Sequence, residues 1–366
     1  MSGFTCMGSD IVNALDRIVK VTAKEPAKLT LSGGNHTNKI EFTAEHDSKL
    51  IQYYIPAINV EKFEPISVPV DRLKSACSKK VAMIFKVSEN SLSFKTKDDV
   101  SKGEIFLKEQ ETIDFSRTLF PKDFLMVTKD VIDLFSYVEL SPDISQSDLI
   151  CFLDSTTTSK LRLASANNNV VAYLSYKSKV EFNPIKTSIL IKYINVFNNL
   201  FNKEPYKLHI GESVIYAKCG TVYIKLPAFE LGDLNLDLIS KTVEERVPTI
   251  TFSCALTALT TALSNIKSAY DKGKPIELVI KDNSLIVKML SNFGKAYETV
   301  EITNLVIGKT KNRSINMNYD MLNNLLSTAS KVKGELSIGF VEDTALKITV
   351  THSNFDIVYM LASVTS

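Results

Sequence analysis

Several features that would place this chain in a common class are missing from its sequence. Tryptophan is absent, and no apolar run approaches the roughly 18 residues that a membrane-spanning helix needs. The first residues, MSGFTCMGSD, lack the basic-then-apolar layout of a secretory signal peptide. The five cysteines are odd in number and form no CxxC pair, which favours reduced thiols over a disulfide framework. We therefore expect a protein of a reducing compartment, the cytosol, with no membrane partner.

Motifs for catalysis and cofactor binding are equally scarce. The four histidines stand alone, without HExxH spacing: His36, His46, His209 and His352. The sequence contains no GxxxxGK[ST] phosphate-binding loop and no GxGxxG run after a strand. Carboxylates cluster at residues 97–100 and 341–344, but hydrolysis with two metal ions needs several carboxylates that converge from strand ends. We expect no catalytic residue, no metal site and no cofactor. A nuclease remains an alternative, and DNA turnover abolished by EDTA would reveal it.

Composition is that of an ordinary globular protein. The chain has 366 residues, of which 45% are hydrophobic and 23% charged, enough for two or three domains with their own cores. Lysine and arginine total 43 against 41 acidic residues, a net charge of +2. This balance does not point to nucleic acid unless the basic residues gather on one surface.

One small unit recurs along the chain. IELVIKDNSLIVKM (276–289) and MIFKVSENSLSFKT (83–96) both alternate apolar and polar residues about a short polar turn, which is typical of a half-buried antiparallel hairpin. Four further segments show the same pattern: 28–42, 149–164, 207–218 and 336–350. The sequence therefore predicts six hairpins, each with one face toward a core.

A segment with helical periodicity precedes each hairpin. These segments begin near residues 10, 70, 129, 186, 253 and 318, about 60 residues apart. Any α+β protein of this length could contain six helices followed by strands, but the regular spacing and the matched hairpins favour a repeat. Because two units make a domain of about 120 residues, we predict three similar domains, 1–118, 119–246 and 247–366.

The predicted helices also have a polar face. In the first helix, Asn13, Arg17, Lys20 and Lys24 fall on one stripe opposite the apolar residues. The other helices add Arg72, Lys74, Lys79, Lys192, Lys267 and Lys331. Lysine and asparagine without interleaved aromatic residues suit phosphate contact better than base stacking. We interpret these residues as a weak, sequence-independent surface for double-stranded DNA, with an ordinary solvated helix face as the alternative. Useful retention on DNA would then need a closed ring that links the two topologically.

The order of these units resembles the bacterial-type DNA polymerase sliding clamp, or β clamp. SVPVDRLKSAC is similar to the start of the second helix of the first clamp domain, and FDIVYMLASV is similar to the C-terminal strand. LRLASANNNVVAYL and the LSN at 263–265 are similar to stretches beside the partner pocket and at the subunit interface. The resemblance covers the whole chain. It implies an α+β fold of three DNA-clamp domains, each with two helices backed by antiparallel sheets, which together form half of a ring.

The resemblance also implies a partner-peptide pocket between the second and third domains. Its lining would be Ala166, Asn168, Asn169, Val170, Val171, Leu231, Leu234, Ala345, Tyr359, Met360, Leu361, Ala362 and Val364. Ordinary packing between domains is the alternative role for these apolar residues. The family's Gly-His-Arg-Leu run is Asn-Asn-Val-Val here, and its Met-Pro-Met-Arg-Leu ending is Met-Leu-Ala-Ser-Val. This drift indicates a divergent clamp, of the kind that a bacteriophage could encode.

Ring closure would pair residues 102–109 of one subunit with residues 261–267 of the other. By the resemblance, Ile105 and Leu107 would meet Leu263 and Ile266. An apolar edge strand left unpaired tends to aggregate, so its capture by a second subunit is physically reasonable. The implied function is a homodimeric ring that tethers a DNA polymerase and is opened by a clamp loader ATPase. The alternative is a monomeric, non-ring polymerase accessory or scaffold protein with the same repeat.

Overall fold

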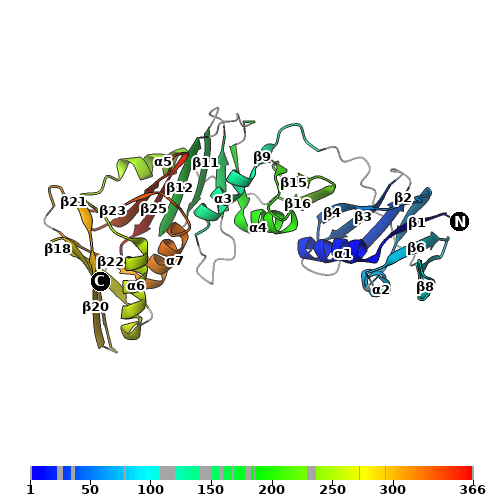
Figure 1. The fold of residues 1–366 in the computed structure, drawn as a ribbon. Helices are drawn as coiled ribbons and strands as arrows, with labels where there is room; N and C mark the ends of the chain where they lie inside the picture. Colours follow the sequence, from blue (N-terminus) through cyan, green and yellow to red (C-terminus); the bar gives the residue numbers. More distant parts are fainter. Residues whose placement is uncertain are drawn as a thin grey trace. The chain divides into compact units, whose positions relative to one another are not determined.

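A computed structural model of the chain forms two compact units, shown in Figure 1. The first unit contains residues 1–129 and 195–230, and the second contains residues 130–194 and 231–366. The structure describes residues 2–22, 28–33, 38–77, 80–107, 120–140, 150–155, 160–166, 169–177, 183–184, 186–228, 236–271, 273–292, 294–310 and 312–364. Every statement below concerns these residues, and each unit is described by itself.

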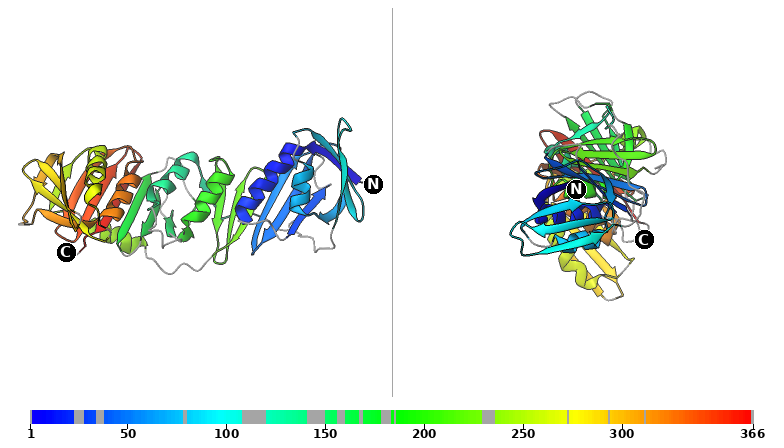
Figure 2. Two further views of the ribbon diagram at one scale, coloured as in Figure 1. Left: turned by 90° about the horizontal axis from the view of Figure 1, so that it is seen from below. Right: turned by 90° about the vertical axis from the view of Figure 1, so that its right-hand side faces the viewer.

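An eight-stranded antiparallel sheet forms the centre of the first unit. Its order is β5-β2-β3-β4-β16-β15-β14-β9. The strands are β5 (Phe63–Ser67), β2 (Lys28–Gly33), β3 (Lys39–His46), β4 (Lys49–Pro56), β16 (Val222–Pro227), β15 (Val214–Cys219), β14 (Tyr206–Ile210) and β9 (Leu125–Val127). Helix α1 (Gly8–Thr22) packs against β3 and β4, as Figures 1 and 2 both show. Its buried residues Leu15 and Ile18 recur with helical spacing, which explains why this segment folds as an amphipathic helix on the sheet.

A second, smaller sheet completes the first unit. Its order is β1-β6-β7-β8, from β1 (Ser2–Met7), β6 (Ala82–Val87), β7 (Ser91–Thr96) and β8 (Lys102–Phe106). The short helix α2 (Val70–Ala76) lies beside α1 and contacts β8. Phe4 and Phe85 stack at 4.8 Å between ring centroids within this core. In the order of this sheet, β8 is the last strand.

The second unit is built on a nine-stranded antiparallel sheet in the order β13-β10-β11-β12-β25-β24-β23-β17-β21. The strands are β13 (Lys186–Leu190), β10 (Ile150–Asp154), β11 (Lys160–Ala166), β12 (Val170–Lys177), β25 (Phe355–Ala362), β24 (Ala345–Thr351), β23 (Glu335–Val341), β17 (Ile250–Ser253) and β21 (Thr303–Ile307). Tyr359 of β25 donates a hydrogen bond to the carbonyl oxygen of Tyr137 in α3 (Lys129–Val138), at 2.8 Å. Helix α7 (Tyr319–Ala329) contacts β25, and α5 (Leu236–Glu245) contacts β12.

A four-stranded sheet forms the rest of the second unit. Its order is β20-β19-β18-β22, from β20 (Gly294–Glu301), β19 (Ser284–Ser291), β18 (Pro275–Lys281) and β22 (Ser314–Asn318). Helix α6 (Leu256–Ile266) covers β19 and β20 and is followed by one short 3₁₀ turn, Lys267–Ala269. The side chain of Asn318 caps α7 by accepting a hydrogen bond from the main-chain N–H of Met321 at 3.0 Å. In the order of this sheet, β20 is an end strand, as β8 is in the smaller sheet of the first unit.

The predicted repeat is confirmed in the hairpins. All six predicted hairpins are present, as β2/β3, β6/β7, β10/β11, β14/β15, β18/β19 and β23/β24. A helix follows each predicted start, although near residue 186 the strand β13 comes first and α4 (Ile191–Leu200) begins later. The structure adds α5, which no pattern had predicted. The three-domain boundaries stay a prediction, because β4 pairs with β16 and β12 with β25, so that each large sheet continues across a predicted boundary.

Within the described residues, no helix is long and apolar enough to cross a membrane.

Candidate nucleic-acid and protein interfaces

The basic residues of α1 and α2 are mostly engaged by neighbours within the first unit. Arg17 donates a hydrogen bond from Nη1 to the hydroxyl of Tyr53 at 2.9 Å, and its guanidinium group also lies over that ring. Lys74 forms an ion pair with Asp16 at 2.6 Å. Lys20 is exposed in the last turn of α1. The groups that this face presents to a polyanion are therefore Lys20, the half-buried Arg17, and Lys74, whose charge is partly offset by Asp16.

Three other predicted basic residues lie at a sheet edge or outside the described residues. Arg72 is highly exposed, and its nearest carboxylate is that of its neighbour Asp71 at 3.9 Å. It lines a hollow beside the strand β8, so it belongs to the sheet edge treated below. Lys24 and Lys79 lie outside the described residues.

In the second unit the predicted basic residues stand on exposed positions. Lys192 in α4 lies with Nζ 5.8 Å from the centroid of the Tyr193 ring. Lys267 follows the end of α6 and Lys331 follows the end of α7, two helices that pack against each other. No carboxylate of the described residues forms an ion pair with Lys267 or Lys331. These two lysines are therefore available to phosphates.

The predicted partner pocket divides between the two faces of the sheet of the second unit. Val171 and Met360 are opposite each other in the β12/β25 register and lie on the face that α5 covers. Ala166 pairs with Val171 in the next strand and lies at the margin of the same apolar cluster. We call the margin of this cluster, formed by the partly buried Ala166, Val171 and Val358 beside the buried Met360, the α5 groove.

Three predicted pocket residues belong to the opposite face of the sheet, and their role in the pocket stays a prediction. Val170, Tyr359 and Leu361 alternate with the groove residues along their strands and are buried at 7%, 0% and 0% exposure. Neighbouring residues of a strand point to opposite faces, so the predicted run of pocket residues is divided between the two faces there. Val364 is half-buried beyond β25, and its N–H donates to the carbonyl oxygen of Asn316 at 3.0 Å. Asn168, Leu231 and Leu234 lie outside the described residues.

Helix α5 is held on the sheet at both ends by charged groups. In its first turn, the carboxylate of Asp237 receives Lys186 at 3.1 Å and Arg162 at 3.0 Å. The hydrogen bonds from Lys186 and then Arg162 hold the pKa of the Asp237 carboxyl below its ordinary value. Arg162 also forms an ion pair with the buried Asp154. The first turn of α5 is thereby tied to β10, β11 and β13.

The last turn of α5 is held by a lysine from β24. Lys347 Nζ donates hydrogen bonds to the carbonyl oxygens of Val243 at 2.7 Å and Arg246 at 3.0 Å. Burial lowers the pKa of Lys347, while Glu244 opposes this shift. A cation at the C-terminal end of a helix satisfies carbonyls that have no partner within the helix. These contacts fix the position of α5, and so the shape of the α5 groove.

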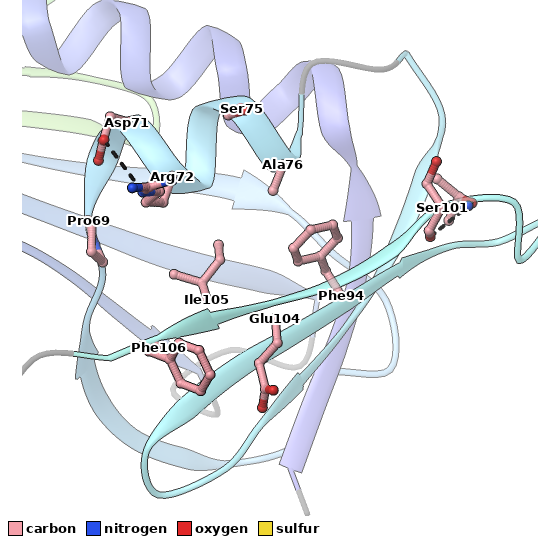
Figure 3. Close-up of a pocket in the computed structure, with 11 residues that line it drawn as sticks. Pro69, Asp71, Arg72, Ser75, Ala76, Phe94, Ser101, Glu104, Ile105 and Phe106 are labelled. Carbon is pink, nitrogen blue, oxygen red and sulfur yellow. Dashed lines mark hydrogen bonds and ion pairs between the residues drawn. The ribbon is translucent and has the colours of Figure 1, made fainter.

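The edge strand of the first unit borders a hollow of about 710 Å³ beneath α2 (Figure 3). Ile105 and Phe94 point toward α2, whereas Phe106 and Glu104 point to the other face of β8. Ile105 is buried at 6% exposure, and Phe106 is 74% exposed. Leu107 is half-buried, with its N–H bonded to the carbonyl oxygen of Asn90 at 2.9 Å. The most accessible apolar residue of this edge is Phe106, which is not among the residues predicted for the interface.

The edge strand of the second unit borders a shallower hollow of about 380 Å³ between α6 and β20. Its lining includes the exposed Ala258 and Thr261 of α6 and the carboxylates Glu298 and Glu301 of β20. Leu263 and Ile266, predicted to meet a second subunit, are 0% and 1% exposed. Both side chains fill the interior of their own unit, and their contact with a second subunit stays a prediction.

Metal ligands and reactive thiols are two kinds of group that would support catalysis in the described residues. No cluster of three metal-ligating side chains occurs among them. None of the five cysteines is in a disulfide, and burial raises the pKa of Cys77 to about 12 and that of Cys254 to about 11. A thiol with so high a pKa stays protonated at neutral pH and is a poor nucleophile.

Comparison with solved structures defines the fold as that of a DNA sliding clamp. The chain is similar to the DNA polymerase III β chain of Streptococcus pneumoniae, with a TM-score of 0.81 at 13% identity and full coverage of both chains. The H. pylori β clamp gives 0.79 at 13% identity, also over both whole chains. The Bacillus subtilis DNA polymerase sliding clamp gives 0.77 at 12% identity, covering 100% of this chain and 99% of the other.

No protein-family model and no curated protein sequence matches this chain. The α+β clamp fold predicted from the order of the repeats is confirmed over the whole chain, and the low identity agrees with the predicted divergence.

Proposed function

We propose that this chain is a DNA sliding clamp, a non-catalytic processivity factor. Two copies would close into a ring around duplex DNA and tether a DNA polymerase in the cytoplasm. The observation that carries the proposal is the full-length match of fold to proteins named as DNA polymerase III β chains and sliding clamps. A tether acts by keeping the polymerase near its template at an effective concentration of about millimolar.

Ring closure is proposed to pair β8 of one copy with β20 of the other. Both strands end their sheets, so each has an edge without a strand partner among the described residues. Each also borders a hollow, of about 710 Å³ and 380 Å³ respectively. Arg72 lines the first hollow together with Asp71 and Glu104, and Glu298 and Glu301 line the second, so Arg72 of one copy is proposed to pair with Glu298 or Glu301 of the other. Because both edges occur in one chain, two copies can satisfy both contacts at once.

Contact with DNA is assigned to the exposed basic residues of the helices. Lys20, Lys267 and Lys331 are exposed, and Arg17 is half-buried beside Tyr53. With a net charge of only +2, such a surface would bind duplex DNA weakly and without sequence preference, which suits a protein that slides.

The polymerase is proposed to bind the α5 groove by a short peptide. The apolar side chains of Val171, Val358 and Met360 offer the few anchor contacts on which such recognition depends. A clamp loader ATPase is proposed to open the ring, since the sequence has no nucleotide-binding motif of its own.

Size-exclusion chromatography with light scattering tests the proposed ring. The wild-type chain should have about twice the 40.7 kDa mass of one chain. Ala258→Glu and Thr261→Glu should shift it to the monomer, because each puts a longer, charged side chain into the hollow that the other copy would cover. Ser264→Glu, an exposed position of the same helix outside the hollow, is the matched control. A wild-type monomer at micromolar concentration would favour the alternative, a monomeric polymerase accessory protein.

A further inference from the structure

The outer face of the four-stranded sheet carries a groove that is separate from the hollow assigned to ring closure, although both are lined by residues of β20. This hollow of about 600 Å³ is lined by residues from β18, β19, β20 and β22. Helix α6 covers the opposite face, where Leu285, Val287 and Met289 are buried. We call this hollow the outer groove.

Strand register places side chains of the outer groove in two adjacent rows across the sheet. Tyr297 is opposite Lys288, Lys288 is opposite Glu277, and Glu277 is opposite Asn316. The next row brings Lys295 opposite Leu290. Side chains opposite one another on one face of an antiparallel sheet are close enough to act on the same ligand.

The apolar part of the outer groove is exposed to an unusual degree. Tyr297 is 75% exposed and Leu290 is 64% exposed. They stand on adjacent strands and one row apart, so together they present an apolar step on the sheet surface. Exposed apolar patches of this kind on a folded protein typically mark a contact site.

The charges of the outer groove select the kind of ligand. Lys288 and Glu277 form an ion pair at 3.4 Å and largely cancel. Lys295 is exposed and has no ion-pair partner among the described residues, so it leaves the groove with a net positive charge. A nucleic acid is disfavoured as the ligand for two reasons. The groove offers a single aromatic ring for base stacking, and the carboxylate of Glu277 would lie beside the phosphates and repel them.

We propose that the outer groove binds a short acidic-apolar peptide, with an apolar side chain against Leu290 and Tyr297 and a carboxylate on Lys295. The peptide would belong to a replication partner, an assignment that rests on the proposed function. A main-chain contact supports a shared partner: the carbonyl oxygen of Asn316 accepts a hydrogen bond from the N–H of Val364, two residues beyond the strand that carries Met360. A partner already anchored at the α5 groove would gain binding strength from this second contact through effective concentration.

Selection from a phage-displayed library of random 12-residue peptides tests the proposal directly. The bait is the full wild-type chain, with counter-selection on the Leu290→Ser/Tyr297→Ser/Lys295→Glu variant. All three side chains are exposed, and circular dichroism should confirm that the variant is folded. Enriched peptides should pair an apolar residue with Asp or Glu. Enrichment of basic peptides, or failure of any peptide to distinguish the two baits, would overturn the proposal.

Fluorescence anisotropy with the most enriched peptide then locates the site. Tyr297→Ser and Lys295→Glu should each weaken binding at least tenfold, whereas Val306→Ser, at an equally exposed apolar position of β21, should not change it. Val171→Ser should also leave it unchanged, and a loss there would assign the peptide to the α5 groove and overturn the proposal. Competition by oligo(dT) as strong as by the peptide would show a nucleic-acid site instead. None of these readouts requires ring closure, so a failure of the proposed clamp function is detected separately.

Discussion

The ammonium group of Lys347 lies 2.7 Å from the main-chain carbonyl oxygen of Val243, so that strand β24 holds the last turn of helix α5. Val243 also belongs to the apolar cluster that underlies the α5 groove. The contact between Lys347 and Val243 thereby helps to position α5 beside the α5 groove.

Replacement of this lysine should loosen α5. Lys347→Met keeps the aliphatic stem but removes a charged donor from two helix carbonyls, which should cost about 1–2 kcal/mol of unfolding free energy. Urea denaturation measures this loss. Affinity for a polymerase-derived peptide should fall as well. Lys331→Met, at an exposed position with no helix carbonyl to hold, should leave both quantities unchanged.

The opposite end of α5 should make stability depend on pH. Because Lys186 and Arg162 lower the pKa of Asp237, its carboxylate stabilises the folded state above the ordinary carboxyl pKa of 3.8. This contribution should disappear as pH falls through the lower pKa of the folded state. Wild type should therefore be more stable than Asp237→Asn near pH 6, and the two should converge below about pH 3. Unfolding curves that differ equally at both pH values would contradict this linkage.

The burial of Leu263 leads to a prediction about folding. Leu263→Ala should lower the unfolding free energy by about 2–5 kcal/mol, the usual cost of a cavity in a packed core. Ser264→Ala, its exposed neighbour, should have almost no effect. Thermal unfolding of the two variants distinguishes a core role from an interface role, since an interface residue would change the oligomer mass with little loss of stability in the monomer.

DNA binding should depend on salt through the exposed lysines. Replacement of Lys20, Lys267 or Lys331 by alanine should reduce the slope of log affinity against log salt by about one for each phosphate contact that is lost. Lys86→Ala, on an outward-facing position of β6, is the matched control. Anisotropy titrations with a labelled duplex at several salt concentrations give these slopes. Equal slopes for all four variants would show that these helices do not face DNA.

The fold could be predicted from the sequence because each repeat consists of local patterns, a segment with helical periodicity and a hairpin with apolar-polar alternation. Ile276 to Met289 alternates buried and outward residues about a polar turn, and the structure pairs them in that register. Helix α5 escaped prediction because its four buried residues lie in a short segment outside the 60-residue repeat. For residues 186–190 the sequence predicts helix where the structure has the strand β13, since Ile189 and Leu190 continue the apolar run of α4 without a break.

The sites followed less well, because an apolar pattern does not say what covers it. Ile266 is periodic whether it faces a second subunit or its own core, and only tertiary packing decides between the two. The exposure of Phe106 and Tyr297 could be predicted from the sequence, because each is a large side chain at a position where the alternation of its strand expects an outward-facing polar residue. In β25, Met360 and its neighbours Tyr359 and Leu361 could be told apart only by their faces in the strand.

The most direct test of the sliding-clamp proposal compares retention on circular and linear DNA. The protein, loaded with a clamp loader ATPase onto a nicked circle, should stay bound through gel filtration at a salt concentration that abolishes its affinity for short duplexes. Linearising the same DNA should release it through the free ends. Equal retention on both forms, or dissociation from both, would contradict a ring that encircles DNA.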